Sequence, residues 1–104
     1  RVAERLRAEG INARCVDIRW LLPLPVEDIV REAKTTGKVL VVDECRETGG
    51  MAEGIITALV EHCPQVQMAR VTGEDTYIPL GAAANLVLVQ EADIEAGIRE
   101  LMSR

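Results

Sequence analysis

The chain has 104 residues, of which 48% are hydrophobic and 28% charged, and its formal net charge is −5. This length is enough for one domain with one core. The acidic balance disfavours a nucleic-acid partner, because the phosphate backbone would be repelled. No apolar run reaches the roughly 18 residues that a membrane-spanning helix needs, so no membrane segment is expected. Three cysteines without a paired motif favour reduced thiols and a cytoplasmic location.

The first residue is an arginine within an apparent helix, and the N-terminal residues do not have the pattern of a signal peptide. We therefore expect residues 1–104 to be a single, partial domain, truncated at its N-terminus and cut from a longer chain.

The first quarter of the chain contains one helix signal and one strand signal. Apolar residues at helical spacing over residues 1–9, followed by Gly10, predict a first helix. Residues 11–18 are rich in β-formers and predict a strand, which the proline-rich corner at 23–25 ends. Pro25 suits the first turn of a second helix. The predicted apolar face of that helix comprises Val26, Ile29, Val30 and Ala33.

The middle of the chain contains a strand followed by a helix. Gly37 stops the second helix, and the continuous apolar run at 39–42 predicts a strand covered on both faces. Gly49 and Gly50 permit a tight turn into a third helix, which Pro64 closes. The residues expected to face inward from this helix are Met51, Ile55, Ile56, Leu59 and Val60.

The last third has weaker signals. Residues 66–71 alternate weakly and predict a strand, residues 72–81 a loop, and residues 86–89 a short strand or extended turn. Asp93 is expected to cap a final helix that carries Ile94, Ile98 and Leu101. The alternation of strands and helices predicts an α/β fold with three α/β/α layers and a mostly parallel sheet.

The loop at 43–50 follows the carboxyl end of a strand, where open α/β sheets usually bind ligands. The Gly49-Gly50 turn could cradle a phosphate or cofactor at the following helix N-terminus. Against this, Gly-Gly-x-x-x-Gly is not the dinucleotide fingerprint, and the surrounding acids would repel a phosphate, with Arg46 the only countercharge. The alternative is that the glycines let the backbone turn tightly against a neighbouring subunit or domain, while the acids favour the helix N-terminus.

Arg19 and Trp20 leave the end of the first predicted strand in a rigid corner. They could be interface anchors, because both residue types are over-represented at binding hot spots. Alternatively, Trp20 covers the end of the sheet and Arg19 pairs with Asp17 or Glu27. The sequence leaves both interpretations open.

His62 is the only histidine, and it stands next to Cys63 near the end of a predicted helix. Adjacent helical side chains diverge by about 100°, so the two do not form a nucleophile–base pair. No group of three or four metal ligands is close by in sequence. We therefore predict no catalytic, cofactor-binding or metal-ligating residue. The candidate interface residues are Arg19, Trp20, Arg46, Gly49 and Gly50.

The order of motifs along the chain resembles a known family. The corner at 16–25 precedes the Thr-Gly-Lys strand segment at 36–44, the Gly-Gly turn at 49–50, the Val-Thr-Gly loop at 71–73 and the last helix from Asp93. This order is similar to the C-terminal domain of the transketolase-like enzymes, and most similar to the β part of the E1 component of thiamine-diphosphate-dependent 2-oxo acid dehydrogenases. The resemblance covers essentially the whole chain.

The resemblance implies a non-catalytic assembly domain. In the parent enzyme, thiamine diphosphate and Mg²⁺ would be bound between two other domains, and the reaction would be oxidative decarboxylation of a 2-oxo acid with acyl transfer to lipoyl. The implied partners are other domains or the α subunit of E1, a second E1 protomer and the acyltransferase (E2) component. The competing classes are an independent small-molecule- or nucleotide-binding α/β domain and a stand-alone interaction module.

The resemblance also implies that the sheet lacks its middle. In the family a strand precedes the first helix and lies between the strands expected at 11–18 and 38–43. These two strands would then lie roughly 10 Å apart, without ladder hydrogen bonds between them. The strand at 66–71 would pair with 38–43 in parallel.

Overall fold

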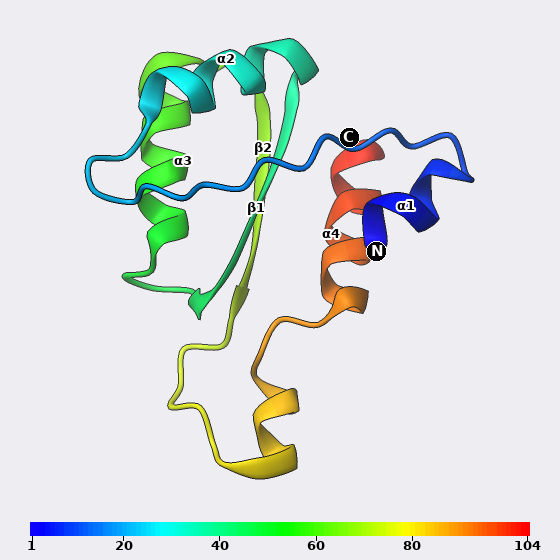
Figure 1. Ribbon diagram of the computed structural model, residues 1–104, viewed down its shortest axis with the longest axis vertical. Helices are drawn as coiled ribbons and strands as arrows, with labels where there is room; N and C mark the ends of the chain where they lie inside the picture. Colours follow the sequence, from blue (N-terminus) through cyan, green and yellow to red (C-terminus); the bar gives the residue numbers. More distant parts are fainter.

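The computed structural model describes all residues from 1 to 104 (Figure 1). Its elements in chain order are α1 (Val2–Arg7), α2 (Val26–Thr36), β1 (Lys38–Arg46), α3 (Met51–His62), β2 (Gln67–Gly73), the 3₁₀ helix η1 (Gly81–Leu86) and α4 (Glu91–Met102).

Two strands stand between two layers of helices (Figure 1). Helices α2 and α3 pack on one another and cover one face of the sheet, while α4 covers the other face and carries α1 on its outer side. The strands are parallel, with Lys38 opposite Gln67 and Asp43 opposite Thr72. The predicted α/β class, the three layers and the parallel pairing of these two strands are confirmed.

The main core lies between the sheet and the α2–α3 layer. Strand side chains alternate, so Val39 and Val41 face α3 while Leu40 faces α4. Val60, which we expected to be inside, is 52% exposed, because it lies about 100° around the helix from the buried Leu59. The buried cluster comprises Ile29, Ala33, Val41, Ala52, Ile55, Leu59, Cys63 and Val66.

The opposite face of the sheet is covered by α4 at close range. A Cβ on Gly97 would lie 2.7 Å from Cγ2 of Val71 and 3.4 Å from the methyl groups of Leu40, so a glycine is required for the helix to lie this near to both strands. The cover is incomplete, because Val42 remains 44% exposed. The prediction that residues 39–42 are covered on both faces is therefore wrong at Val42.

Ion pairs dock α1 onto α4. Arg99 forms two hydrogen bonds to the Glu9 carboxylate, at 2.7 and 2.8 Å, and Arg5 forms one to Glu91 at 2.8 Å. The Glu9 and Glu95 carboxylates raise the pKa of Arg99. These side chains are about half exposed, so solvent screens the ion pairs and each adds little to stability.

Residues 11–18 do not form the predicted strand. They belong to a long extended segment between α1 and α2, and no backbone–backbone hydrogen bond involves residues 12–23. A strand needs a neighbour, and β1 pairs only with β2, which leaves its other edge free. The expected absence of ladder bonds between 11–18 and 38–43 is confirmed, whereas a strand between them stays a prediction.

The segment before α4 also differs from prediction. Instead of a short strand at 86–89, the chain forms η1 and then irregular backbone, and only one backbone hydrogen bond, from the Glu74 N–H to the Val87 carbonyl, joins it to the end of β2. Gln90, not Asp93, is the N-cap of α4. Asp93 stands three residues further on and accepts a hydrogen bond from the Gln90 N–H at 2.8 Å, as in a capping box.

The molecule exposes an unusually large surface. Its accessible area is 7252 Å², whereas a compact monomer of its mass would expose about 5,800 Å². Only 13 of its 104 residues are buried. None of the helices combines the length and apolarity that crossing a membrane would need.

We expect the free edge of β1 to be paired in a longer form of the protein. A strand contributed by residues N-terminal to Arg1 would lie between β1 and the 11–18 segment, because both have unused backbone donors and acceptors. A crystal structure of the longer protein checks this. Direct hydrogen bonds between 11–18 and β1 in that structure would contradict the prediction.

Candidate functional site

The corner that follows the extended segment places apolar side chains in solvent. Trp20 is 70% exposed and Leu22 is 89% exposed, whereas Ile18 and Leu24, on either side, pack against the main core. The corner is thus fixed at both ends while its tip faces outward.

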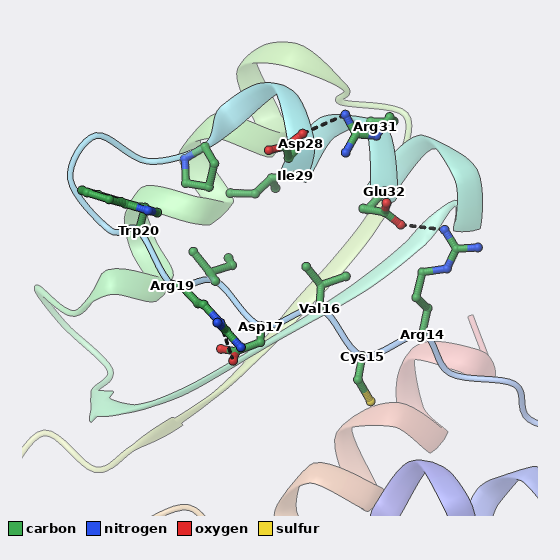
Figure 2. A pocket seen from close by; sticks show the side chains of 12 residues that line it. Arg14, Cys15, Val16, Asp17, Arg19, Trp20, Asp28, Ile29, Arg31 and Glu32 are labelled. Carbon is green, nitrogen blue, oxygen red and sulfur yellow. Dashed lines mark hydrogen bonds and ion pairs between the residues drawn. The ribbon is translucent and has the colours of Figure 1, made fainter.

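Arg19 lies near Asp17, with Nε 3.8 Å from the carboxylate oxygen. Both side chains are more than four-fifths exposed, so this ion pair adds little to stability. Of the partners considered for Arg19, the structure selects Asp17. Trp20 does not cover the end of the sheet, because its ring projects from the outer loop (Figure 2).

A groove of about 570 Å³ runs between the extended segment and α2 (Figure 2). Its charged side chains neutralise one another in pairs: Arg14 with Glu32 at 2.6 Å, and Arg31 with Asp28 at 2.7 Å. The groove therefore offers no uncompensated charge for an ionic ligand. The residues that line it are Arg14, Cys15, Val16, Asp17, Ile18, Arg19, Trp20, Pro25, Asp28, Ile29, Arg31 and Glu32.

Asp43 organises the loop between β1 and α3. One carboxylate oxygen accepts the Cys45 N–H at 2.9 Å, and the other accepts the Ala52 N–H at 2.8 Å. Asp43 thus caps the N-terminus of α3, since Gly50, at the N-cap position, has no side chain to do so. Partial burial acts to raise the pKa of Asp43, but the hydrogen bonds outweigh it and hold the pKa below its ordinary value.

A second carboxylate ties this loop to the loop after β2. Asp75 accepts hydrogen bonds from both the N–H and the hydroxyl of Thr48, the former at 2.8 Å. The Thr48 hydroxyl and N–H hold the pKa of Asp75 below its ordinary value. Arg46 donates from Nε to the Thr48 carbonyl at 3.0 Å, so it closes the same turn from the other side.

This geometry bears on the phosphate-cradle interpretation. The Ala52 N–H, which a phosphate would use, already binds the Asp43 carboxylate, and two further acids lie in the same loop. No group of three or more histidine, cysteine or acidic side chains converges to hold a metal ion. His62 is the last residue of α3, as expected. The residues of this chain therefore do not fit a diphosphate or its metal ion.

The structure separates the two sets of candidate interface residues. Arg19 and Trp20 lie in the corner before α2, whereas Arg46, Gly49 and Gly50 lie in the loop before α3, and no hydrogen bond or ion pair joins them. That these residues form a contact surface stays a prediction. Sequence reasoning missed the link between Thr48 and Asp75. The only sequence signal for this link was an aspartate in a loop with turn-forming neighbours.

The parallel sheet between two helical layers defines an α/β domain. The family model of the transketolase C-terminal domain matches residues 1–100. The chain therefore belongs to the transketolase C-terminal domain family.

Curated relatives extend this finding. The chain is 35% identical to 2-oxoisovalerate dehydrogenase subunit beta of Bacillus subtilis (strain 168), over 95% of this chain and 32% of that protein. It is 26% identical to pyruvate dehydrogenase E1 component subunit beta of the same organism, and 28% identical to the protein of that name from Staphylococcus aureus (strain Mu50 / ATCC 700699). In both cases the match covers 98% of this chain and 32% of the relative. The chain thus spans about a third of the length of these relatives.

Substitution of Gly50 by alanine should destabilise the loop. The new Cβ would lie 2.8 Å from the Arg46 carbonyl oxygen, which is backbone and cannot move aside cheaply. We expect a loss of about 1–3 kcal/mol in the free energy of unfolding, measured by urea denaturation. Gly54→Ala is the matched control: its Cβ meets nothing within 4 Å, and we expect a gain of about 0.5–1 kcal/mol from the better helix propensity. Equal effects of the two substitutions would contradict this account.

The Asp43 cap should make stability depend on pH. Because the folded-state pKa of Asp43 is lowered, its contribution is present above the unfolded value of about 3.9 and is lost as the pH falls through the folded value. We expect Asp43→Asn to cost about 0.5–2 kcal/mol at pH 7, and the difference from wild type to shrink below pH ~3.9. Urea denaturation of both proteins at pH 7 and at a pH below ~3.9 measures this difference in stability. Asp17→Asn, at an exposed ion pair, is the control and should change stability little at either pH.

Proposed function

We propose that this chain is the non-catalytic C-terminal assembly domain of the β part of a thiamine-diphosphate-dependent 2-oxo acid dehydrogenase E1, acting in the cytoplasm. The observation that carries the proposal is similarity along 95–98% of the chain to three E1 β-type proteins. In the parent enzyme the reaction would be oxidative decarboxylation of a 2-oxo acid with transfer of the acyl group to lipoyl.

The proposed division of labour leaves the cofactor to other domains. Thiamine diphosphate and Mg²⁺ need diphosphate and metal ligands, and this chain has neither a converging ligand group nor a free helix N-terminus after β1. The residues of this chain instead hold two turns in fixed conformations. The Asp43 cap and the Thr48–Asp75 link stabilise the 43–50 loop, and packing of Ile18 and Leu24 holds the corner.

We assign these two turns to contacts within the assembled enzyme: with other domains or the α subunit of E1, with a second E1 protomer, or with the acyltransferase component. The corner presents Trp20 beside an arginine, a combination frequent at the centre of interfaces. The net charge of −5 favours a basic partner surface, because opposite charges speed encounter and orient the partners.

A second function is favoured by one observation. The groove beside α2, about 570 Å³, falls within the usual size range of small-molecule sites, about 300–1,000 Å³. An independent small-molecule-binding domain would use it. The charged side chains of the groove are already paired with one another, so an occupant would have to compete with existing ion pairs. This favours the assembly role instead.

Radical footprinting of Trp20 tests the assembly role. Trp20 is the only tryptophan among residues 1–104, and its exposed ring should be oxidised rapidly in the unassembled protein. We expect its oxidation rate to fall at least threefold when the α and β parts of the parent enzyme assemble. Met102, which is 48% exposed at the end of α4, is the internal control: its oxidation rate in the same sample shows any change in the radical dose. An unchanged rate at Trp20 in the assembled enzyme would show that the corner remains in solvent.

A further inference from the structure

The sheet has two strands, so β2 leaves one edge without a partner strand. In a parallel ladder, successive residues direct their backbone N–H and C=O groups to opposite sides of the strand. The Gln67 N–H donates to the Gly37 carbonyl at 3.0 Å, so residues 67, 69 and 71 direct these groups toward β1. Residues 68, 70 and 72 therefore direct theirs outward, away from the sheet.

Two contacts close this edge at its ends. The Arg104 guanidinium donates to the Met68 carbonyl at 3.3 Å, and the Glu74 N–H donates to the Val87 carbonyl at 3.1 Å. Both contacts use outward backbone groups, as the alternation along the strand requires. The open part of the edge lies between them and comprises residues 70–72.

A groove of about 840 Å³ lies along the open part of this edge. The backbone N–H and C=O groups of Arg70 and Thr72 have no hydrogen-bond partner there. Helix α4, which covers one face of the sheet (Figure 1), lines the groove with the small residues Ala96 and Gly97. Donors and acceptors that alternate along an exposed strand edge are a template for another extended backbone.

The charges in the groove select the side chains of its occupant. Of the charged side chains that line it, only Glu74 has neither a hydrogen bond nor an ion pair. Glu74 thus leaves one uncompensated negative charge beside the open edge, in a chain of net charge −5. A basic occupant is therefore favoured. The lining side chains that already have partners are Glu47, Arg70, Asp93, Glu100 and Arg104.

We propose that the free edge of β2 binds a short extended segment of another polypeptide, which adds a strand to the sheet and places a lysine or arginine beside Glu74. In this mode of recognition, main-chain hydrogen bonds hold the segment and alternate side chains determine its specificity. The proposal does not rest on the assembly role of the corner and the 43–50 loop, because it uses backbone groups of β2 that neither of them contacts.

Other occupants fit the groove less well. An anionic ligand would meet the charge of Glu74, while both arginines of the groove are already paired. The edge of a second folded sheet does not fit, because Arg104 and Val87 close the slot at its ends and leave room for a few residues of free strand. A small molecule without an extended backbone would leave part of the groups of Arg70 and Thr72 unpaired.

Hydrogen–deuterium exchange of the full-length protein tests the proposal with a synthetic probe, acetyl-Val-Lys-Val-Lys-Val-amide. We expect the probe to slow exchange saturably at residues 70–72. Two N-methylated forms of the probe, one alkylated at the lysine amides and one at the valine amides, present opposite sides of the strand. One of them should bind about tenfold more weakly than the other, because its alkylated amides face β2.

Three results of this experiment would overturn the proposal. The first is unchanged exchange at residues 70–72 when the probe is added. The second is equal binding of the two N-methylated forms. The third is protection of residues 70–72 in the full-length protein before the probe is added, because a segment of its own chain would then already occupy the edge.

Variants of the protein separate the backbone contact from the charge. Thr72→Pro removes an outward N–H and leaves the bonds to β1 in place, since proline is tolerated where a strand N–H faces solvent. We expect the dissociation constant of the probe to rise about tenfold in Thr72→Pro and about threefold in Glu74→Gln. Glu61→Gln, at an exposed acid of α3, is the control and should leave that constant unchanged. An unchanged constant in Thr72→Pro or Glu74→Gln, or an equal rise in the control, would contradict strand addition at β2.

Discussion

Both helical layers depend on the parallel pairing of β1 with β2. Alternate side chains of β1 point to opposite faces, so Val41 anchors the α2–α3 layer while Leu40 meets α4 at Gly97. Two strands alone are marginally stable in water, so the pair is stabilised by the helices that cover it. The layers are thus held together through two strands only, each of which leaves one edge unpaired.

The free edge explains the large exposed surface. The extended segment between α1 and α2 has no backbone partner over residues 12–23, and it is tethered to the core through Ile18 and Leu24. Backbone groups that are unpaired here remain in water, which costs little in solution but leaves the segment ready to accept a strand.

Local patterns predicted the elements whose stability is local. The helical spacing of Ile29 and Ala33 gave α2, and Gly37 ended it, because both signals act within one or two turns. The run at 39–42 predicted β1 because a buried parallel strand is apolar throughout. The strand predicted at 11–18 does not form. Its residues suit a strand, but a strand is stable only beside a partner strand, and no local pattern provides one.

In the candidate site, too, the local features were predicted from the sequence and the non-local interactions were not. Gly49 and Gly50 predicted a tight turn, and the turn is present, since their backbone conformation is a local property. The interactions that fix it are not local. Asp43 caps a helix nine residues away and Asp75 bonds to a residue 27 positions earlier. The acids of this loop were expected to favour the helix N-terminus. Asp43 does so by accepting the Ala52 N–H in the first turn of α3, whereas Asp75 accepts the N–H of Thr48 in the preceding loop.

The exposed surfaces differ in chemistry. The corner combines Trp20 with a weakly paired Arg19 and suits a polar, mixed interface. Residues 76–90, the arm that follows β2, carry no charged side chain and expose Tyr77 and Leu80. Because the arm follows the carboxyl end of β2 while the corner lies beside α2, occupation of one surface does not cover the other (Figure 1). The two surfaces therefore lie far enough apart on the domain that each can be altered by substitution without changing the other.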